Sequence, residues 1–92
     1  MISTFKRPDT EALFNGKRVA RFVNIQVVAL RKLAMLNRAE NLGDLSVPPN
    51  NRLEPLKRDQ AGQWSIRIND QWHVCFRFEG GHTYDVDIVD DH

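Results

Sequence analysis

The stretch QWSIRINDQWHVCFRFEGGHTYDVDIVDDH, residues 63–92, decides the fold of this 92-residue chain. Apolar and polar residues alternate along three runs within it, and a period of two predicts β-strands that bury one face. These runs are residues 63–68, 72–78 and 83–89. Asn69-Asp70-Gln71 and Gly80-Gly81-His82 separate the runs, and residues of these types are typical of tight turns. The stretch therefore predicts two consecutive antiparallel hairpins.

The register of these hairpins follows from placing the apolar side chains on one face. With a three-residue turn in each hairpin, Ile66 pairs with Val74 and Phe78 pairs with Tyr84. A shift of one residue would move apolar side chains to the solvent side, so this register is favoured. The predicted core face carries Trp64, Ile66, Ile68, Val74, Phe76 and Phe78, with Val86 across from Phe76 and Ile88 across from Val74.

The other face of the predicted hairpins is polar. It carries Ser65, Arg67, His73, Arg77, Asp85 and Asp87. In this register Arg67 lies across from His73, and the tail from Asp90 to His92 runs alongside the start of the second strand. An arginine and histidines therefore meet near one end of the sheet, which suits chemistry on a phosphodiester.

The start of the chain reads as a short strand and a short helix. Residues 1–5 alternate weakly, and Pro8 is expected to stop this first strand. Asp9 or Thr10 then caps a helix, because short polar side chains accept hydrogen bonds from the first helical N–H groups. Gly16 is expected to end the helix.

A second, longer helix follows. Its core face is defined by helical spacing of Phe22, Ile25, Val28, Ala29, Leu33 and Leu36. Asn37 or Gly43 is expected to end it, and residues 39–45 predict a further short helical turn. Residues 46–50 contain two successive prolines and predict a loop, whereas Pro55 marks an edge strand or a bulge.

Length and element order together predict one α+β domain spanning residues 1–92. The expected fold is a small antiparallel-rich sheet with an N-terminal strand and two helices packed on one face, in the order βααβββ(β).

The formal net charge is only +1, but the charges are unevenly distributed. The first two-thirds of the chain are rich in Lys and Arg, whereas the last third ends in Asp85, Asp87, Asp90 and Asp91. A basic body suits a polyanion, or an acidic protein that imitates one. The near-neutral total argues against strong, purely non-specific binding of nucleic acid.

Several classes of site find no support in the sequence. The three histidines lack metal-ligand spacing, and Cys75 has no second cysteine beside it, so we expect no metal and no cofactor. A single cysteine in an apolar run is typical of a reducing compartment. No apolar run approaches the roughly 20 residues that span a membrane, and no leader pattern begins the chain. We therefore expect a cytoplasmic protein without membrane contact.

Metal-independent cleavage of RNA needs a base for the 2′-hydroxyl, a cation for the phosphorane and an acid for the departing 5′-oxygen. Histidine serves as acid or base near neutral pH, arginine matches phosphate, and a lysine near other cations has a lowered pKa. The candidates are Lys57, Arg67, His73 and His92, with Asp90 orienting a neighbour. The residue pattern alone leaves open that this face is only a solvated polar surface.

Four segments resemble the HigB branch of the RelE/ParE toxin superfamily, and the similarity runs nearly end to end. They are NRLEPLKRDQAGQWSIRINDQWHVCFRF, the terminal VDIVDDH, the early DTEALFNGK and the helical RKLAMLNRAENLGDL. The resemblance implies the toxin of a type II toxin–antitoxin pair that cuts translated mRNA in the decoding site of the ribosome. It also implies a helix-turn-helix antitoxin of the HigA type. Contact with operon DNA would then be indirect, through that antitoxin.

The resemblance assigns roles to four positions. Lys57 matches an active-site lysine of the family, and Arg67 matches an arginine used on the scissile phosphate. Asp90 and His92 match the first and last residues of the family's D-Y-H ending.

Three positions depart from the family pattern. His73 stands where an arginine is common, which weakens phosphate binding at neutral pH unless Arg67 compensates. Asp91 replaces a tyrosine, which removes a stacking surface and adds a negative charge near the RNA. Glu54 stands where some members have histidine.

Residues and resemblance together give a mechanism. His92, or Lys57 with a low pKa, removes the 2′-hydroxyl proton, Arg67 stabilises the phosphorane, and His73 assists Arg67 or protonates the leaving oxygen. Contacts to ribosome and mRNA are expected from Lys17, Arg18, Arg21, Arg31, Lys32, Arg38, Arg52, Arg58 and Gln71.

Two other functions remain open at this point. ParE relatives share the fold but poison DNA gyrase without cleaving RNA. The departures at His73 and Asp91 also fit a catalytically weakened toxin that still binds its antitoxin.

Overall fold

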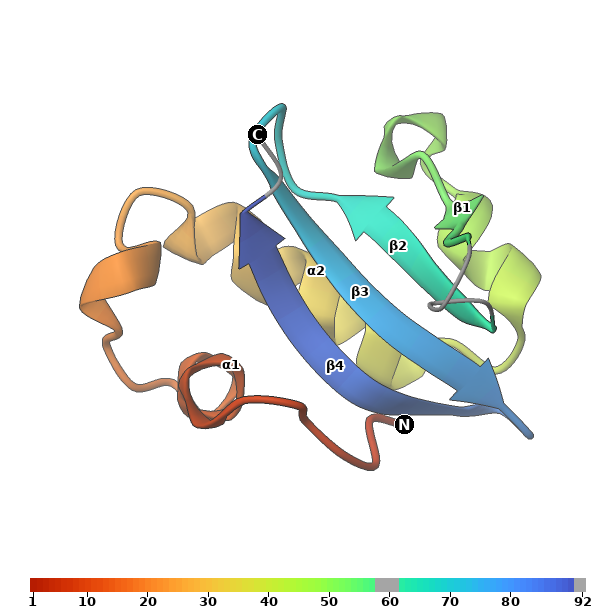
Figure 1. The fold of residues 1–92 in the computed structure, drawn as a ribbon, viewed down its shortest axis with the longest axis horizontal. Coiled ribbons are helices and arrows are strands. Elements are labelled where there is room, and N and C mark those ends of the chain that lie inside the picture. The colour runs from red at the N-terminus through yellow and green to blue at the C-terminus, as the bar shows by residue number, and fades with distance from the viewer. Residues whose placement is uncertain (58–61, 91–92) are drawn as a thin grey trace.

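The computed structural model describes residues 1–57 and 62–90. Its elements are α1 (Pro8–Phe14), η1 (Ala20–Phe22), α2 (Gln26–Arg38), η2 (Leu42–Ser46), η3 (Pro49–Asn51), β1 (Glu54–Pro55), β2 (Gln63–Arg67), β3 (Trp72–Glu79) and β4 (His82–Asp90). The strands form one sheet in the order β1-β2-β3-β4, and every neighbouring pair is antiparallel. Helix α2 crosses behind the sheet, and α1 lies beside β4 (Figure 1). The α+β prediction is confirmed, including the edge strand at Pro55.

The predicted N-terminal strand is wrong. Residues 1–5 make only two isolated parallel bridges to β4, Ile2 with Thr83 and Phe5 with Val86. These bridges are three residues apart, whereas a strand pairs with a period of two. The segment nevertheless follows the β4 edge, because Ser3 N donates to Thr83 O at 2.7 Å and Lys6 N donates to Val86 O at 2.9 Å.

Helix α1 begins earlier than predicted. Arg7 is its N-cap, and Pro8 occupies the first helical position rather than ending a strand. Proline suits that position because the first helical N–H groups have no intrahelical acceptor. The predicted caps have other partners: Asp9 pairs with Arg21, and Thr10 Oγ1 accepts from Ile88 N at 3.3 Å. Gly16 follows the helix with φ +86, as expected of a C-terminal glycine.

Helix α2 begins at Gln26, after Phe22 has been placed in the separate turn η1. Ala29, Leu33 and Leu36 are buried on its core face as predicted. The helix ends at Arg38, and the short helical turn expected after it is η2, which Asn41 and Asp44 cap reciprocally. No helix in the part of the chain that the structure describes has the length and apolarity needed to cross a bilayer.

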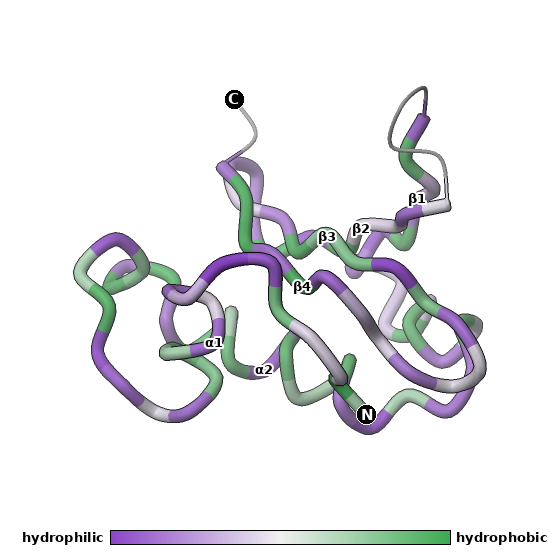
Figure 2. Tube along the Cα trace, turned by 60° about the horizontal axis from the view of Figure 1, so that its bottom comes forward, coloured by the Kyte–Doolittle hydropathy of each residue, from purple (hydrophilic) through white to green (hydrophobic). Residues whose placement is uncertain are grey.

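The register of the first hairpin is confirmed. Ile66 pairs with Val74 and Arg67 pairs with His73. The apolar side chains of β2 and β3 therefore face α2, and Ile66, Val74 and Phe76 are fully buried. Figure 2 shows this alternation: hydrophobic and hydrophilic residues follow one another along the strands.

The register of the second hairpin is correct at one end only. Val74 pairs with Ile88 as predicted, but Phe78 pairs with Thr83 and Tyr84 pairs with Arg77. A β-bulge near Asp85, whose φ is +55, inserts one extra residue into β4. The turn shortens to Gly80-Gly81, and both glycines have positive φ, as a two-residue hairpin turn requires.

Candidate active site

A cavity of about 310 Å³ lies on the face of the sheet that α2 does not cover. Its floor carries Gln63, Ser65, His73, Cys75 and Asp87, all from the polar face of β2, β3 and β4. Ser65, Cys75 and Asp87 form one cross-strand row, because Cys75 pairs with both neighbours. The walls are formed by Lys6 and Arg7 from the N-terminal segment, Leu56 after β1, and Val89 and Asp90 at the end of β4.

Two of the predicted catalytic residues line this cavity. His73 lies on its floor, and Asp90 stands at the end of β4, where its Oδ2 accepts a hydrogen bond from Gln71 Nε2 at 3.1 Å. Arg67 shares the open face as the cross-strand partner of His73 but does not line the cavity itself. Its Nη2 pairs with Asp70 Oδ1 at 2.5 Å, and this ion pair lowers the pKa of the Asp70 carboxyl.

The other predicted catalytic residues lie at or beyond the limits of the described chain. Lys57 is exposed and directly follows Leu56, whose N–H is bonded to Gln63 O at 2.8 Å. His92 lies outside the described residues, and so do Asp91 and Arg58.

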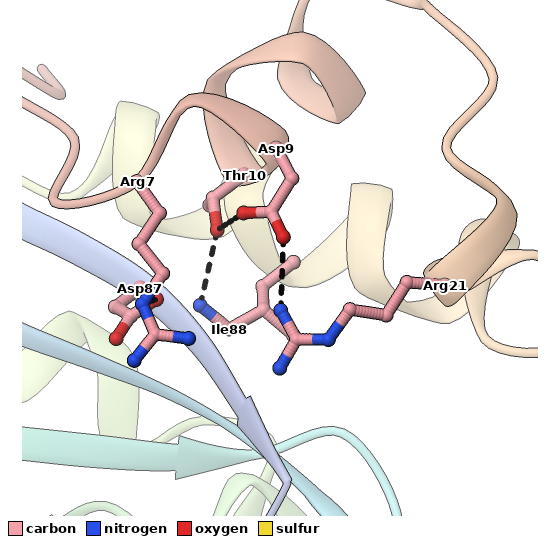
Figure 3. Close-up of polar contacts among 6 residues, drawn as sticks. All are labelled: Arg7, Asp9, Thr10, Arg21, Asp87 and Ile88. Atoms are coloured by element: carbon pink, nitrogen blue, oxygen red, sulfur yellow. Dashed lines mark hydrogen bonds and ion pairs between the residues drawn. The ribbon is translucent and has the colours of Figure 1, made fainter.

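An ion pair that the sequence did not reveal closes one side of the cavity. Arg7 Nε lies 3.5 Å from Asp87 Oδ1, and Figure 3 shows Arg7 reaching from the start of α1 to Asp87 on β4. The Asp87 side chain is only 4% exposed, whereas that of Arg7 is 51% exposed. Burial raises the pKa of Asp87, and the nearby charges of Arg7 and Lys6 offset that effect only in part. Desolvation therefore outweighs ion pairing at this carboxyl.

A second ion pair braces the same region. Arg21 Nη1 donates to Asp9 Oδ2 at 2.9 Å, next to Thr10 (Figure 3). The Arg21 guanidinium also lies over Phe22, at 5.0 Å from the ring centroid, and over Trp72, at 5.3 Å. Arg21 thus links α1 and η1 to the start of β3, which is a structural role beside the RNA contact expected of it.

Lys32 is not exposed, as the predicted contact to ribosome or mRNA would require. It is 6% exposed, and its Nζ donates a short hydrogen bond to Asn51 Oδ1. Burial lowers the pKa of Lys32, with smaller contributions from the positive charges of Arg31 and Arg67. In this position its ammonium group is not available to a ribosomal phosphate, so the predicted contact is withdrawn.

The remaining predicted RNA contacts among the described residues are exposed but do not gather at the cavity. Arg31 and Arg38 belong to α2, on the opposite layer of the molecule. The other exposed members of the set are Lys17, Arg18, Arg21, Arg52 and Gln71. Of these, Gln71 alone among the described residues bonds to a residue of the cavity wall, Asp90.

Sequence reasoning placed Asp87 on the polar face without giving it a role, and it missed the contribution of Lys6 and Arg7. The predicted register did contain a signal for Asp87, because it put Asp87 on the neighbouring strand and on the same sheet face as His73. No periodic pattern could bring residue 7 to residue 87. Among the described residues, no three His, Cys, Asp or Glu side chains gather as a metal site would require.

Solved structures of other toxins share this fold. The chain superimposes with a TM-score of 0.62 on a YoeB–YefM complex from Staphylococcus aureus, at 15% identity, covering 100% of this chain and 98% of that one. YafQ from Escherichia coli gives a TM-score of 0.57 at 14% identity, covering 98% and 91%. A YoeB/ParE toxin from Agrobacterium tumefaciens gives 0.53 at 20% identity, covering 99% and 96%. At these identities the likeness concerns the fold alone.

Sequence relatives are closer. The chain is 33% identical over 94 residues to the endoribonuclease HigB of Proteus vulgaris, and the alignment spans 100% of both chains. It is 32% identical over 83 residues to the toxin HigB-1 of Vibrio cholerae, covering 88% of this chain and 87% of that one. The family model for the RelE-like toxin of the type II toxin–antitoxin system HigB matches residues 10–92. The chain therefore belongs to the HigB-like toxin family of type II toxin–antitoxin systems.

Proposed function

We propose that this chain is an endoribonuclease that cuts translated mRNA in the decoding site of the ribosome and thereby stops growth. The observation that carries the proposal is the cavity on the open sheet face, which His73 and Asp90 line and beside which Arg67 lies as the cross-strand partner of His73. The end-to-end similarity to the endoribonuclease HigB of Proteus vulgaris supports the same reaction.

The residues divide the reaction between them. A base, His92 or Lys57, takes the proton of the ribose 2′-hydroxyl, and the 2′-oxygen attacks the adjacent phosphorus. Arg67 stabilises the negative charge of the phosphorane with its planar guanidinium. The bond from phosphorus to the 5′-oxygen breaks, and His73 as imidazolium donates the proton that the leaving oxygen needs. The products are a 2′,3′-cyclic phosphate and a 5′-hydroxyl, and no step requires a metal ion.

Asp70 restrains Arg67 before substrate binds. The Asp70 carboxylate is 98% exposed and close to Arg67 Nη2, so it occupies the guanidinium from the solvent side. An exposed ion pair of this kind is worth little energy, and a phosphate can displace the carboxylate. Asp70 would thus occupy Arg67 Nη2 until a phosphate takes its place, at small energetic cost.

The exposed cations outside the cavity would bind ribosomal RNA. Phosphate contacts position a protein on RNA without reading its sequence, so a dispersed set serves this purpose. The set is Lys17, Arg18, Arg21, Arg31, Arg38 and Arg52; Arg58, which lies outside the described residues, is expected to act with them. A helix-turn-helix antitoxin of the HigA type would be the neutralising partner; the Staphylococcus aureus relative of similar fold was solved as a YoeB–YefM complex.

The test is primer extension on mRNA after expression of the chain without an antitoxin, followed by purified toxin on programmed ribosomes. Codon-phased cuts are expected, and Arg67→Ala should abolish them. Arg77→Ala is the matched control, because Arg77 lies on the same sheet face but across from Gln63, at the other end of β2 from Arg67, and pairs with Glu79 and Asp85. Growth arrest with DNA damage and intact mRNA would instead identify a ParE-type gyrase poison. Absence of arrest would identify a weakened toxin.

A further inference from the structure

The proposed reaction gives no role to the N-terminal wall of the cavity. We propose that Arg7, positioned by Asp87 and assisted by Lys6, binds a backbone phosphate of an RNA strand that lies across the open face of the sheet. This inference rests on the proposed function, because it names where the RNA substrate of that cavity is held.

The backbone fixes Lys6 and Arg7 at the rim of the cavity. Lys6 N donates to Val86 O at 2.9 Å, so the segment is attached to β4 immediately before the two side chains. Helix α1 starts at Pro8, directly after them, and Thr10 Oγ1 accepts from Ile88 N. Because the chain is held on both sides, the two cations enter the cavity wall from a defined direction.

The Arg7 guanidinium has donors left for a ligand. Its Nε lies 3.5 Å from Asp87 Oδ1, and no hydrogen bond runs from its Nη1 or Nη2 to a described residue. The two Nη groups form the planar fork that matches two oxygens of a phosphate. With half of its side chain exposed, Arg7 can reach a strand in the cavity without leaving Asp87.

Asp87 explains why the arginine is held there. The Asp87 carboxylate is buried, the nearby cations offset its desolvation only in part, and within the described chain its Oδ1 accepts no hydrogen bond, so it costs the fold stability. Its position makes sense as an anchor that keeps the guanidinium facing the cavity. Arg77 and Asp85 offer the contrast: both are well exposed, and Arg77 is also occupied by Glu79 at 2.8 Å.

The first test measures single-turnover cleavage on programmed ribosomes as a function of toxin concentration. We expect Arg7→Gln to raise the half-saturating concentration roughly 10- to 100-fold, the range of a charge-assisted phosphate contact. Arg7→Lys should raise it less, because it keeps the charge and loses the fork. Arg77→Gln, the matched control, should leave it unchanged. An unchanged half-saturating concentration for Arg7→Gln, whatever its maximal rate, overturns the proposal.

Asp87 is a positioning residue in this scheme, and a double-mutant cycle separates that role from a general structural one. Asp87→Asn should raise the half-saturating concentration in the otherwise native toxin but not in the Arg7→Gln background, because the two act through one guanidinium. Equal effects in both backgrounds would refute the coupling.

A binding measurement distinguishes failure of this inference from failure of the proposed function. The side-chain Nε–H resonance of Arg7 is followed by NMR while an uncleavable oligonucleotide with 2′-O-methyl riboses is added to the isolated toxin. We expect this resonance to shift and that of Arg77 to stay in place. If the native toxin leaves mRNA uncut, the proposed function fails; a static Arg7 resonance then overturns the inference as well, whereas a shift sustains it.

Discussion

Replacing the buried carboxylate of Asp87 by an amide should make the protein more stable at neutral pH. Burial raises the pKa of Asp87 above its ordinary value of 3.8 despite the nearby cations. The folded state thus binds the proton of Asp87 more tightly than the unfolded state does. The protonated Asp87 carboxyl therefore contributes to the free energy of unfolding at acid pH, and this contribution is lost as the pH rises from about 3.8 through the folded-state pKa.

The magnitude follows from two opposing effects. Replacing a whole buried ion pair by apolar residues of similar volume is neutral or stabilises a protein by roughly 1 to 4 kcal/mol, and here the partner left behind, Arg7, is half exposed and keeps its hydration. In the native protein the Asp87 carboxylate is attracted to the half-exposed Arg7, and the amide of Asp87→Asn loses that attraction. We therefore expect the free energy of unfolding of Asp87→Asn at pH 8 to exceed that of the native protein by only about 1 kcal/mol, near the lower end of the range. For a domain of this size, about 1 kcal/mol shifts Tm by roughly 4–8 °C.

The assay is thermal unfolding followed by circular dichroism at several pH values between 8 and 4. The gain of Asp87→Asn over the native chain should shrink steadily as the pH falls, because the native carboxyl becomes protonated. Asp85→Asn on the same strand is the control, since its side chain is 51% exposed, and its Tm should change little at any pH. A lower Tm for Asp87→Asn at pH 8, or a gain that does not depend on pH, would refute the reasoning.

Two further predictions concern the scaffold. Asn51→Ala should cost about 2–3 kcal/mol in urea unfolding, because it leaves the buried Lys32 ammonium without its acceptor and frees Leu45 O from a 3.1 Å hydrogen bond; a loss below about 0.5 kcal/mol would contradict this. Asp85→Val should cost about 1–2 kcal/mol because a β-branched residue is strained at φ +55. Asp85→Gly should stay within about 0.5 kcal/mol of the native protein, and equal losses for both variants would argue against the bulge.

The sequence was sufficient for the first hairpin and insufficient for the second. In β2 and β3 the alternation is unbroken, so only one register buries every apolar residue. In β4 the extra residue of the bulge is the polar, exposed Asp85, which a regular strand would also place on the solvent side. Tyr84 also favoured the wrong register. In a regular strand its ring would lie on the apolar face, but in the structure the ring centroid lies 4.8 Å from the Arg77 guanidinium on the open face.

The candidate site was predictable where it depends on the sheet and not where it depends on contacts far apart in sequence. His73 and Arg67 follow from strand register, whereas the pairing of Arg7 with Asp87 joins opposite ends of the chain. The burial of Lys32 had a local signal that was not used. Residues 29, 32, 33 and 36 share one helical face, so a lysine at position 32 falls within the core stripe.

The segment that follows the β4 edge also bears on self-association. Main-chain groups at the rim of a sheet can template a strand from another molecule, which leads to aggregation. Here Met1 O and Thr4 O accept hydrogen bonds from the N–H groups of Thr83 and Val86, and Thr10 Oγ1 accepts one from Ile88 N–H. At the opposite rim, β1 is only two residues long and contains Pro55, which has no N–H to offer. Over the part of the chain that the structure describes, neither rim presents a long open ladder, so a toxin that accumulates without its antitoxin is protected against fibrous growth by strand addition.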